Sequence, residues 1–341
     1  MSRPLRLLLA ASFILSTPLL AAGGGAAAYL KKPDAWFATP EAKTIAVTIL
    51  SYQSDYGGWP KNTDTVDKPY TGDRKELKPT FDNGATTDEL RFLARTFNAT
   101  KDASFQKAFA KGLDYLLKAQ YPNGGWPQYI PLSKQYHRHI TFNDGAMVRV
   151  MEFLREVRDS PVYGFVPAAD RKSAIEAFEK GVDCILKCQI VVDGKPTVWC
   201  AQHDEVTLKP ANARAYELAS FSGSESAGIT RLLMSLEKPG PEIIKAVEGA
   251  VAWFQSSKVT GIRIDSKNGD KIVVPDPSAK PLWARFYDLK TGKPYFCDRA
   301  GIPKPNLADI GKERRNGYSW YGTYAASLLE KDYPAWKQRV R

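Results

Sequence analysis

Histidine is the scarcest catalytic residue type in this chain, with three copies among 341 residues. So few imidazoles leave little room for acid–base chemistry that depends on histidine. The chain also has no Gly-x-Ser-x-Gly elbow, no His-Glu-x-x-His zinc motif and no phosphate-binding glycine loop. These absences argue against the common serine hydrolases, the zinc peptidases and the P-loop nucleotide enzymes.

Cysteine is almost as rare, with four residues at positions 184, 188, 200 and 297. Their spacing does not fit a zinc site. In an oxidising compartment, four cysteines allow three disulfide pairings. Cys184 and Cys188 lie four residues apart on an expected helix, which is a poor geometry for a bond between them. A bond from one of them to Cys200 is therefore the favoured pairing.

Long apolar runs are missing from the chain except at the N-terminus. Arg3 and Arg6 precede the apolar run Leu7–Leu20, and small residues follow it. This order predicts a secretory signal peptide over residues 1–22. The run is too short for a typical membrane span, and no later stretch approaches the necessary length. We expect a secreted protein, extracellular or periplasmic, with no membrane partner; a retained N-terminal anchor is the alternative.

The chain also lacks an excess of acidic residues. Its formal net charge is +11, and two of these charges come from the arginines of the signal. A basic exported protein favours a polyanionic partner. Lysine and arginine are dispersed along the chain, and no nucleic-acid-binding motif is visible. An acidic polysaccharide is therefore the expected partner, rather than a nucleic acid. No feature indicates oligomerisation, so we expect a monomer.

Helical periodicity is what the chain has in abundance. Apolar residues recur at helical spacing over 41–52, 87–97, 105–120, 145–158, 171–188, 225–236 and 241–255. Glutamines 53, 120, 189 and 255 close every second helix, at intervals of 67, 69 and 66 residues. Repeats of this length with two helices each predict helical hairpins. We expect the hairpins to close into an (α/α) toroid, with their connecting loops on one side.

The last third of the chain departs from this pattern. β-Branched and polar residues alternate over Thr260–Val274, which predicts a hairpin around Asn268-Gly269. A final helix is expected over Thr323–Lys331. No linker or change of composition marks a second domain, so residues 23–341 are expected to form a single catalytic domain.

Two similar stretches each precede a helix: Phe81-Asp-Asn-Gly-Ala85 and Phe142-Asn-Asp-Gly-Ala146. Asp144 lies where a carboxylate can cap the helix that follows, and Asp82 could cap a helix in the same way. Capping is the simple structural interpretation. The aromatic Gly-Gly-Trp-Pro loop upstream of each stretch favours a functional one, although these tryptophans could also pack between the hairpins.

The polar groups near the loops are mostly carboxylates, amides and guanidinium groups. Carboxylate and amide oxygens suit Ca²⁺, and arginine pairs with carboxylates in a bidentate manner. Tryptophan and tyrosine in the loops suit stacking on sugar rings. This inventory predicts the binding of an acidic sugar chain with calcium. Arg214 also lies close in sequence to Glu217, so that a salt bridge is the structural alternative for this arginine.

Six stretches, in order over nearly the whole mature chain, resemble the family 10 polysaccharide lyases, which are pectate lyases. They are Tyr56-Gly-Gly-Trp-Pro-Lys-Asn62, Thr80-Phe-Asp-Asn-Gly-Ala85, Asn123-Gly-Gly-Trp-Pro-Gln128, Ile140-Thr-Phe-Asn-Asp-Gly-Ala146, Trp283-Ala-Arg-Phe-Tyr287 and Arg315-Asn-Gly-Tyr-Ser-Trp-Tyr321. The resemblance implies a mainly α fold, an incomplete (α/α) toroid with a few short strands and a cleft across one face. It also implies Ca²⁺-dependent β-elimination on polygalacturonate, fastest at alkaline pH.

The resemblance further implies roles for single residues. It makes Asp144 the calcium-binding residue and Arg214 the base that removes the proton from C5 of the sugar. Arginine is normally protonated, so Arg214 could act as a base only if nearby cations and low solvent access lower its pKa. Substrate-binding roles are implied for four residues, which are Asp82, Asn83, Arg285 and Arg299.

Two other functions remain open at this point. A non-catalytic protein that binds acidic polysaccharides would use the same cleft without chemistry. An (α/α) glycoside hydrolase would need a carboxylic acid and a carboxylate at one site, which Asp82 and Asp144 could supply. Only a lyase would release an unsaturated product.

Overall fold

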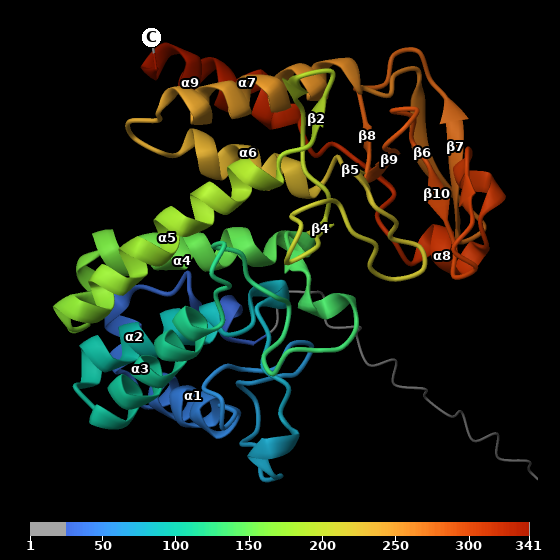
Figure 1. Ribbon diagram of the computed structural model, residues 1–341. Coiled ribbons are helices and arrows are strands. Elements are labelled where there is room, and N and C mark those ends of the chain that lie inside the picture. The colour runs from blue at the N-terminus through green and yellow to red at the C-terminus, as the bar shows by residue number, and fades with distance from the viewer. Residues whose placement is uncertain (1–24, 341) are drawn as a thin grey trace, which may run out of the picture.

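The computed structural model describes residues 25–340, so the expected signal peptide over 1–22 lies outside the described residues. Figure 1 shows that helices dominate this part of the chain, with short strands gathered toward the C-terminal region. No helix within residues 25–340 has the length and hydropathy that a membrane span requires. The mainly α fold class expected from the sequence is confirmed.

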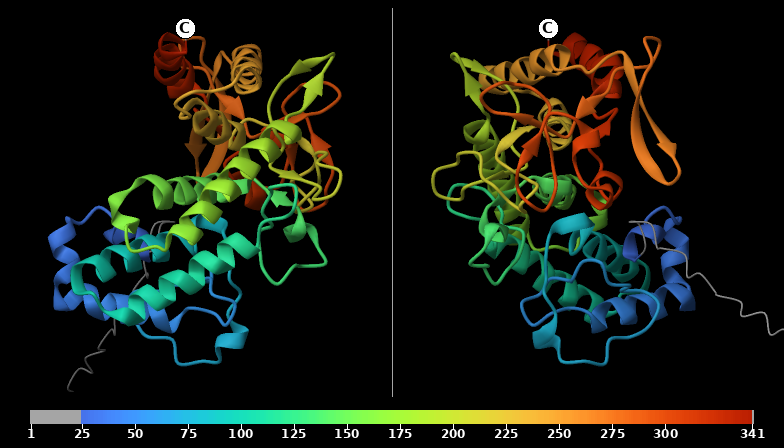
Figure 2. Two further views of the ribbon diagram at one scale, coloured as in Figure 1. Left: turned by 60° about the vertical axis from the view of Figure 1, so that its left-hand side comes forward. Right: turned by 90° about the vertical axis from the view of Figure 1, so that its right-hand side faces the viewer.

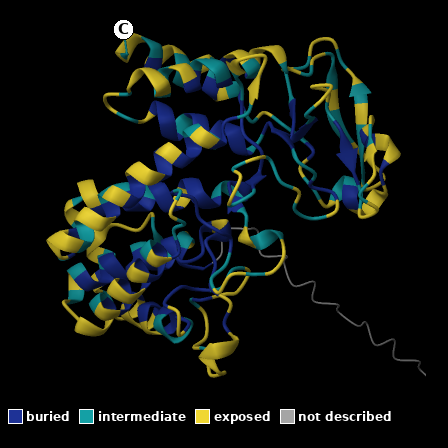
Figure 3. Cartoon of the chain, viewed as in Figure 1, coloured by how far each residue is buried: buried dark blue, intermediate teal, exposed yellow. Residues whose placement is uncertain are grey.

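The helical hairpins form two layers (Figure 1). The outer layer runs from neighbour to neighbour through α1 (Pro40–Ser51), α3 (Ala103–Lys118), α5 (Ala168–Cys188) and α7 (Pro241–Ser256). The inner layer consists of α2 (Thr87–Thr100), α4 (Ala146–Asp159) and α6 (Glu225–Met234), which contact one another in that order. This is the incomplete (α/α) toroid. The inner helices lie between neighbours and are largely buried, whereas the outer helices expose one face (Figure 3).

The same tryptophan contact joins each loop to its outer helix. The four tryptophans of the repeats are buried, and each indole donates a hydrogen bond to a carbonyl near the end of the preceding outer helix. The pairs are Trp59 to Ile49 at 2.8 Å, Trp126 to Leu116 at 2.9 Å, Trp199 to Ile185 at 2.7 Å and Trp283 to Phe254 at 2.9 Å. These tryptophans therefore pack between the hairpins, as the structural interpretation of the loops predicted. Their buried rings are not available for stacking on a sugar.

The periodic glutamines connect one repeat to the next. The side-chain amide of Gln53 donates to the carbonyls of Gly57 in its own loop and Ala108 in the next outer helix, both at 2.8 Å. Gln120 and Gln189 make the same pair of bonds one and two repeats later. Gln255 is exposed and ends the series. The glutamine period thus marks real contacts between neighbouring hairpins, because each amide joins a carbonyl of its own loop to a carbonyl within the next outer helix.

The strands are short and pair in twos within the described residues. Three antiparallel pairs connect distant loops at one end of the helices, and two more pairs are local. They are β1 (Ile140–Thr141) with β4 (Gln202–His203), β5 (Ser220–Ser222) with β9 (Phe286–Asp288), β8 (Trp283–Ala284) with β12 (Tyr321–Gly322), β10 (Phe296–Cys297) with β11 (Pro303–Lys304), and β2 (Val191–Val192) with β3 (Lys195–Pro196).

The hairpin expected around Asn268-Gly269 is confirmed. Strand β6 (Ile262–Lys267) pairs with β7 (Asp270–Pro275), and Lys267 faces Asp270 across the turn. Both turn residues have positive φ, 52° and 68°, which matches the Asn-Gly signal. Figure 2 shows this hairpin as an arm that extends from the side of the molecule.

The C-terminal helices differ from the expectation. A short helix that the sequence did not predict, α8 (Lys312–Asn316), precedes the last strand. The final helix begins later than expected, at residue 326, contains a π-helical turn over Leu328–Asp332 and continues as α9 (Tyr333–Arg339). The helix therefore exists, but both of its expected ends were wrong.

All four cysteines are free and buried. The Sγ atoms of Cys184 and Cys188 lie 4.0 Å apart, one turn apart on α5. Cys200 instead lies against the carbonyl of Ala211, with its sulfur 3.7 Å from that oxygen. The expected disulfide to Cys200 is therefore wrong, because its thiol packs in the core as a small apolar group.

Candidate active site

The candidate residues lie at the turns from which the inner helices begin. Asn83, just before α2, and Asp144, just before α4, both have left-handed backbone conformations, with φ of 55° and 51°. Asparagine and aspartate tolerate this region better than other non-glycine residues. The two turns, Asp82–Gly84 and Asn143–Gly145, contact each other. The similar stretches in the sequence thus form neighbouring turns in space.

Neither aspartate caps the helix that follows it. The turn before α2 is closed by a capping box, in which Thr86 N–H donates to Glu89 Oε2 at 2.8 Å. The start of α4 has no side-chain cap. Capping, the simple structural interpretation of Asp82 and Asp144, is therefore wrong, and both carboxylates are directed elsewhere.

A polar pocket of about 150 Å³ receives these groups. Its lining joins the turns before α2 and α4 to the loop that carries Arg214. The residues are Lys61, Asn62, Asp82, Asn83, Gln128, Tyr136, Asn143, Asp144, Gln202, Arg214 and Glu217. Of the six residues with expected roles, four line this pocket, whereas Arg285 and Arg299 do not. We call it the reaction pocket.

Asp82 is buried, and only one of its two carboxylate oxygens has hydrogen-bond partners among the described residues. Its Oδ2 accepts a hydrogen bond from Gln128 Nε2 at 2.7 Å and pairs with the ammonium group of Lys61. Its Oδ1 has no hydrogen-bond partner among the described residues, and the side-chain oxygens of Gln128 and Gln202 lack one too. Each buried acceptor without a donor costs about 1–3 kcal/mol. Three such oxygens in one pocket suit a bound cation.

Asp144 is held from behind by Arg285. One carboxylate oxygen accepts from Arg285 Nη2 at 2.8 Å, and the other accepts from Asn143 Nδ2 at 2.7 Å. Burial raises the pKa of Asp144, but the charge and hydrogen bond of Arg285 outweigh it and hold the pKa below its usual value. Asp144 is therefore ionised at any pH near neutrality or above.

Arg285 is a buried anchor in this structure. Its Nη2 also donates to Glu225 Oε1 at 2.6 Å, and its guanidinium lies 4.7 Å from the ring centre of Tyr318. The side chains of Arg285 and Glu225 are 8% and 1% exposed. The structure thus places Arg285 behind Asp144, in contact with two carboxylates of its own chain.

Arg214 reaches the reaction pocket as half of an ion pair. Its Nε donates to Glu217 Oε2 at 2.6 Å, and its Nη2 pairs with the other oxygen. Tyr318 donates to the same glutamate at 2.5 Å. Burial lowers the pKa of Arg214, but the hydrogen bond and charge of Glu217 raise it further, so that the net shift is upward. The salt bridge named as the structural alternative is present, and the pKa moves opposite to what a base requires.

Arg299 lies at the rim of the arginine group. Its side chain is 68% exposed and pairs with Glu313 at 3.1 Å. Tyr216 connects it to the pocket, because the guanidinium groups of Arg214, Arg299 and Arg314 lie 5.1, 5.9 and 4.6 Å from its ring centre. Such contacts hold cations at a surface where a polyanion can meet them.

Sequence reasoning missed part of the pocket. Lys61 and Gln128 both stand two residues after the tryptophan of their loops, and both contact Asp82. Their equivalent position in two repeats was a usable signal. Gln202 reaches the pocket from the short strand β4, Tyr136 from a single 3₁₀ turn and Glu217 from a loop, and none of them carries such a signal.

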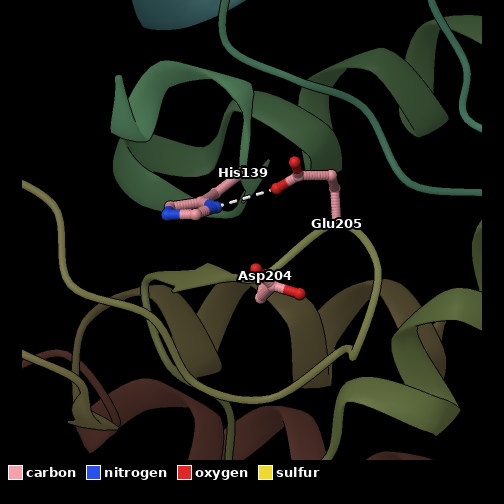
Figure 4. A group of neighbouring side chains, drawn as sticks. All are labelled: His139, Asp204 and Glu205. Atoms are coloured by element: carbon pink, nitrogen blue, oxygen red, sulfur yellow. Dashed lines mark hydrogen bonds and ion pairs between the residues drawn. The ribbon is translucent and has the colours of Figure 1, made fainter. Parts of the chain in front are cut away.

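A second polar cluster, formed by His139, Asp204 and Glu205, has the residue types of a metal site (Figure 4). Glu205 accepts a hydrogen bond from His139 at 2.9 Å and also pairs with Arg138. Asp204 accepts from the backbone N–H groups of Val206 and Thr207, at 3.1 and 2.7 Å. Both carboxylates of this cluster already have donors, as Asp144 does, but the reaction pocket also offers three oxygens that have no hydrogen-bond partner among the described residues.

Comparisons with known proteins agree with this geometry. The model of the pectic acid lyase family matches residues 53–329. This chain belongs to the pectic acid lyase family. A family 10 polysaccharide lyase from Cellvibrio cellulosa is 37% identical over 92% of this chain and 96% of that chain, with a TM-score of 0.80. No curated protein matches the chain.

A second similar structure contains a ligand. It is an aspartate-to-alanine variant of a family 10 polysaccharide lyase from Cellvibrio cellulosa in complex with trigalacturonic acid. It is 36% identical over 92% of this chain and 98% of that chain, with a TM-score of 0.79. The predicted family, fold and pectate lyase activity are thus confirmed, and the binding-protein and glycoside hydrolase alternatives are set aside.

Proposed function

We propose that this pectate lyase cleaves polygalacturonate by calcium-assisted β-elimination and releases 4,5-unsaturated oligogalacturonides. The reaction pocket carries the proposal. It combines carboxylates and unpartnered oxygens with two cations, Lys61 and Arg214, within one small space. A galacturonate chain has a carboxylate on every sugar, so it matches both the cations and a carboxylate-bound metal.

The residues present fit a calcium ion. Calcium prefers several carboxylate and amide oxygens, and Asp144, Asp82 and Asn83 offer these in adjacent turns. Asp144 would be the principal ligand, because it is ionised and half-exposed. When bound, the ion would neutralise the sugar carboxylate and stabilise the charge that develops beside it.

We assign proton removal to Arg214. In its neutral form Arg214 would accept the C5 proton, the electron pair of the C5–H bond would form the C4=C5 double bond, and the C4–O bond would break. The departing oxygen would then take a proton from water. Because Glu217 raises the pKa of Arg214, the neutral form is scarce, and the rate should rise with pH.

We also propose that the protein is secreted after loss of residues 1–22 and acts as a monomer. The basic composition suits a polyanionic substrate outside the cell. Cell fractionation with N-terminal sequencing, and the elution volume on a sizing column, would test these two points.

The central test is ultraviolet absorbance of the unsaturated product, with polygalacturonate at alkaline pH and either Ca²⁺ or a chelator. We expect a rise that the chelator abolishes. Asp144→Asn should need far more Ca²⁺ for half-maximal rate, whereas the control Asp114→Asn on α3 should behave as the parent. Reducing ends without absorbance would mean hydrolysis, and a full rate in the chelator would remove calcium from the proposal.

A further inference from the structure

A second pocket, larger than the reaction pocket, opens beside it. Its volume is about 730 Å³, within the range of sites that hold small molecules. Three segments form it: the end of the first tryptophan loop, residues 75–79, and residues 129–137. Lys61, Lys75 and Lys78 are its charged residues, and we call it the lysine groove. We propose that the lysine groove is an additional subsite for galacturonate residues of the substrate, beyond the sugars at the reaction centre.

The lysine groove and the reaction pocket are continuous. Lys61 and Asn62 line both. Lys61 stands at the junction, where its ammonium pairs with Asp82 on one side and lies 5.7 Å from the ring centre of Tyr129 on the other. A polymer that passes through the reaction pocket can therefore extend into the groove without leaving the surface.

The walls of the groove are fixed to each other by backbone pairing. Pro60 bridges to Pro79, and Thr80 bridges to Tyr129, so the three segments are in register. The hydroxyl of Thr80 also donates to the carbonyl of Gln128 at 2.6 Å. Such a preformed site loses little conformational entropy when a ligand binds.

The charge of the groove has one sign. No carboxylate lines it among the described residues. Lys75 and Lys78 are exposed, and neither forms an ion pair within residues 25–340. Unpaired cations in a groove raise the local concentration of a polyanion and bind its carboxylates.

Aromatic rings give the groove a surface for the sugars themselves. Tyr129 and His137 pack edge to face, with ring centres 5.3 Å apart, and Tyr56 at the opening is 51% exposed. Amphipathic rings of this kind offer an apolar face and a polar edge, which suits a sugar ring with its carboxylate held by lysine. The inference rests on the proposed function, because the ligand is the substrate of that reaction.

A chain-length series tests the proposal. Tri-, penta- and heptagalacturonate would be assayed by product absorbance with the parent protein and with Lys75→Ala/Lys78→Ala. Each exposed pair adds little binding energy, so we expect kcat/KM on the heptamer to fall about three- to tenfold, mainly through KM, with the smallest loss on the trimer. Tyr56→Ala should show the same dependence on length.

A matched control separates local binding from total charge. Lys43→Ala/Lys238→Ala removes two exposed lysines from α1 and from the loop before α7, and it should leave all three substrates unaffected. An equal loss at all lengths, no loss at any length, or the same loss in the control would overturn the proposal. If the parent yields no unsaturated product, the proposed function fails. Calorimetric titration of heptagalacturonate then still tests the groove by itself, since the double variant should bind it more weakly than the control does.

Discussion

The aspartates of the reaction pocket and the arginines in and around it come from two different regions of the molecule. Asp82 and Asp144 stand in equivalent turns of successive hairpins, where the repeat fixes their position. Arg214, Arg285 and Arg299 come from irregular segments, and each pairs with a glutamate of those later segments or of α6. On the hairpin side, Asp82 Oδ1 and Gln128 Oε1 still lack donors among the described residues, whereas each of the three arginines is paired with a glutamate. We infer that the hairpin turns bind a cation. The arginines, in contrast, can exchange their glutamate partners for carboxylates of the substrate.

The largest effect is expected from removing the arginine that faces the hairpin turns. Arg214→Ala should lower kcat about 100- to 10,000-fold, the contribution that a general base makes, and leave polygalacturonate binding largely intact. Turnover would be measured by product absorbance and binding by calorimetry. Arg171→Ala on α5 is the control. Equal weakening of turnover and binding would show instead that Arg214 is a binding residue.

Removing Arg285, which is buried, should lower the free energy of unfolding more than removing an exposed arginine does. Arg285→Gln leaves Glu225 buried without its cation, and breaking a buried pair costs about 3–5 kcal/mol. Denaturant unfolding would measure the loss. Arg299→Gln breaks an exposed pair and should leave the unfolding curve nearly unchanged. Equal stability of the two variants would contradict the distinction between an anchoring and a surface arginine.

Glu89 shows what happens to a buried carboxylate of the hairpins that pairs with no cation among the described residues. Burial, and then the charge of Asp88, raise its pKa to about 7. A raised pKa in the folded state means that stability is full below the ordinary value of 4.5 and is lost as pH rises through 7. The loss should reach roughly 3 kcal/mol between those limits.

Glu89→Gln should remove this dependence, because its amide can keep the bonds to Thr86 and Thr65 without a charge. Unfolding free energies at pH 5 and pH 8 would be compared with those of the parent and of Glu41→Gln, an exposed change on α1. If Glu89→Gln keeps the parental difference between the two pH values, another group causes it.

The regularity of the hairpins also explains what the sequence could predict. Helix positions follow from periodic residues close along the chain, and the two similar stretches mark Asp82, Asn83 and Asp144 as residues of equivalent turns. Arg285 could not be placed in the same way, because its partner Asp144 lies 141 residues away. Whether a long side chain faces substrate or turns inward depends on tertiary packing. Local periodicity carries no information about such packing.

The same limit applies to the lysine groove and to the cysteines. Lys75 and Lys78 lie in a polar loop with no periodic pattern, and backbone bridges at Pro60 and Thr80 help to hold that loop beside Tyr129. Cys200 lay at a suitable sequence distance for a disulfide, yet its thiol faces Ala211. In both cases the deciding contacts join segments whose relative position the sequence does not specify.

The smallest expected effect is also the sharpest test of whether Arg214 acts as a base. Glu217 raises the pKa of Arg214, so Glu217→Gln should lower that pKa and move the rise of rate with pH toward neutrality. At a fixed pH below the optimum, kcat should then increase several-fold, by an amount that depends on the change in the neutral fraction of Arg214. Glu313→Gln, which weakens the ion pairs of Arg299 and Arg314 instead, is the matched control. If Arg214 only binds substrate as a cation, its protonation does not limit the rate, and the pH profile of Glu217→Gln would keep its position while KM alone changes.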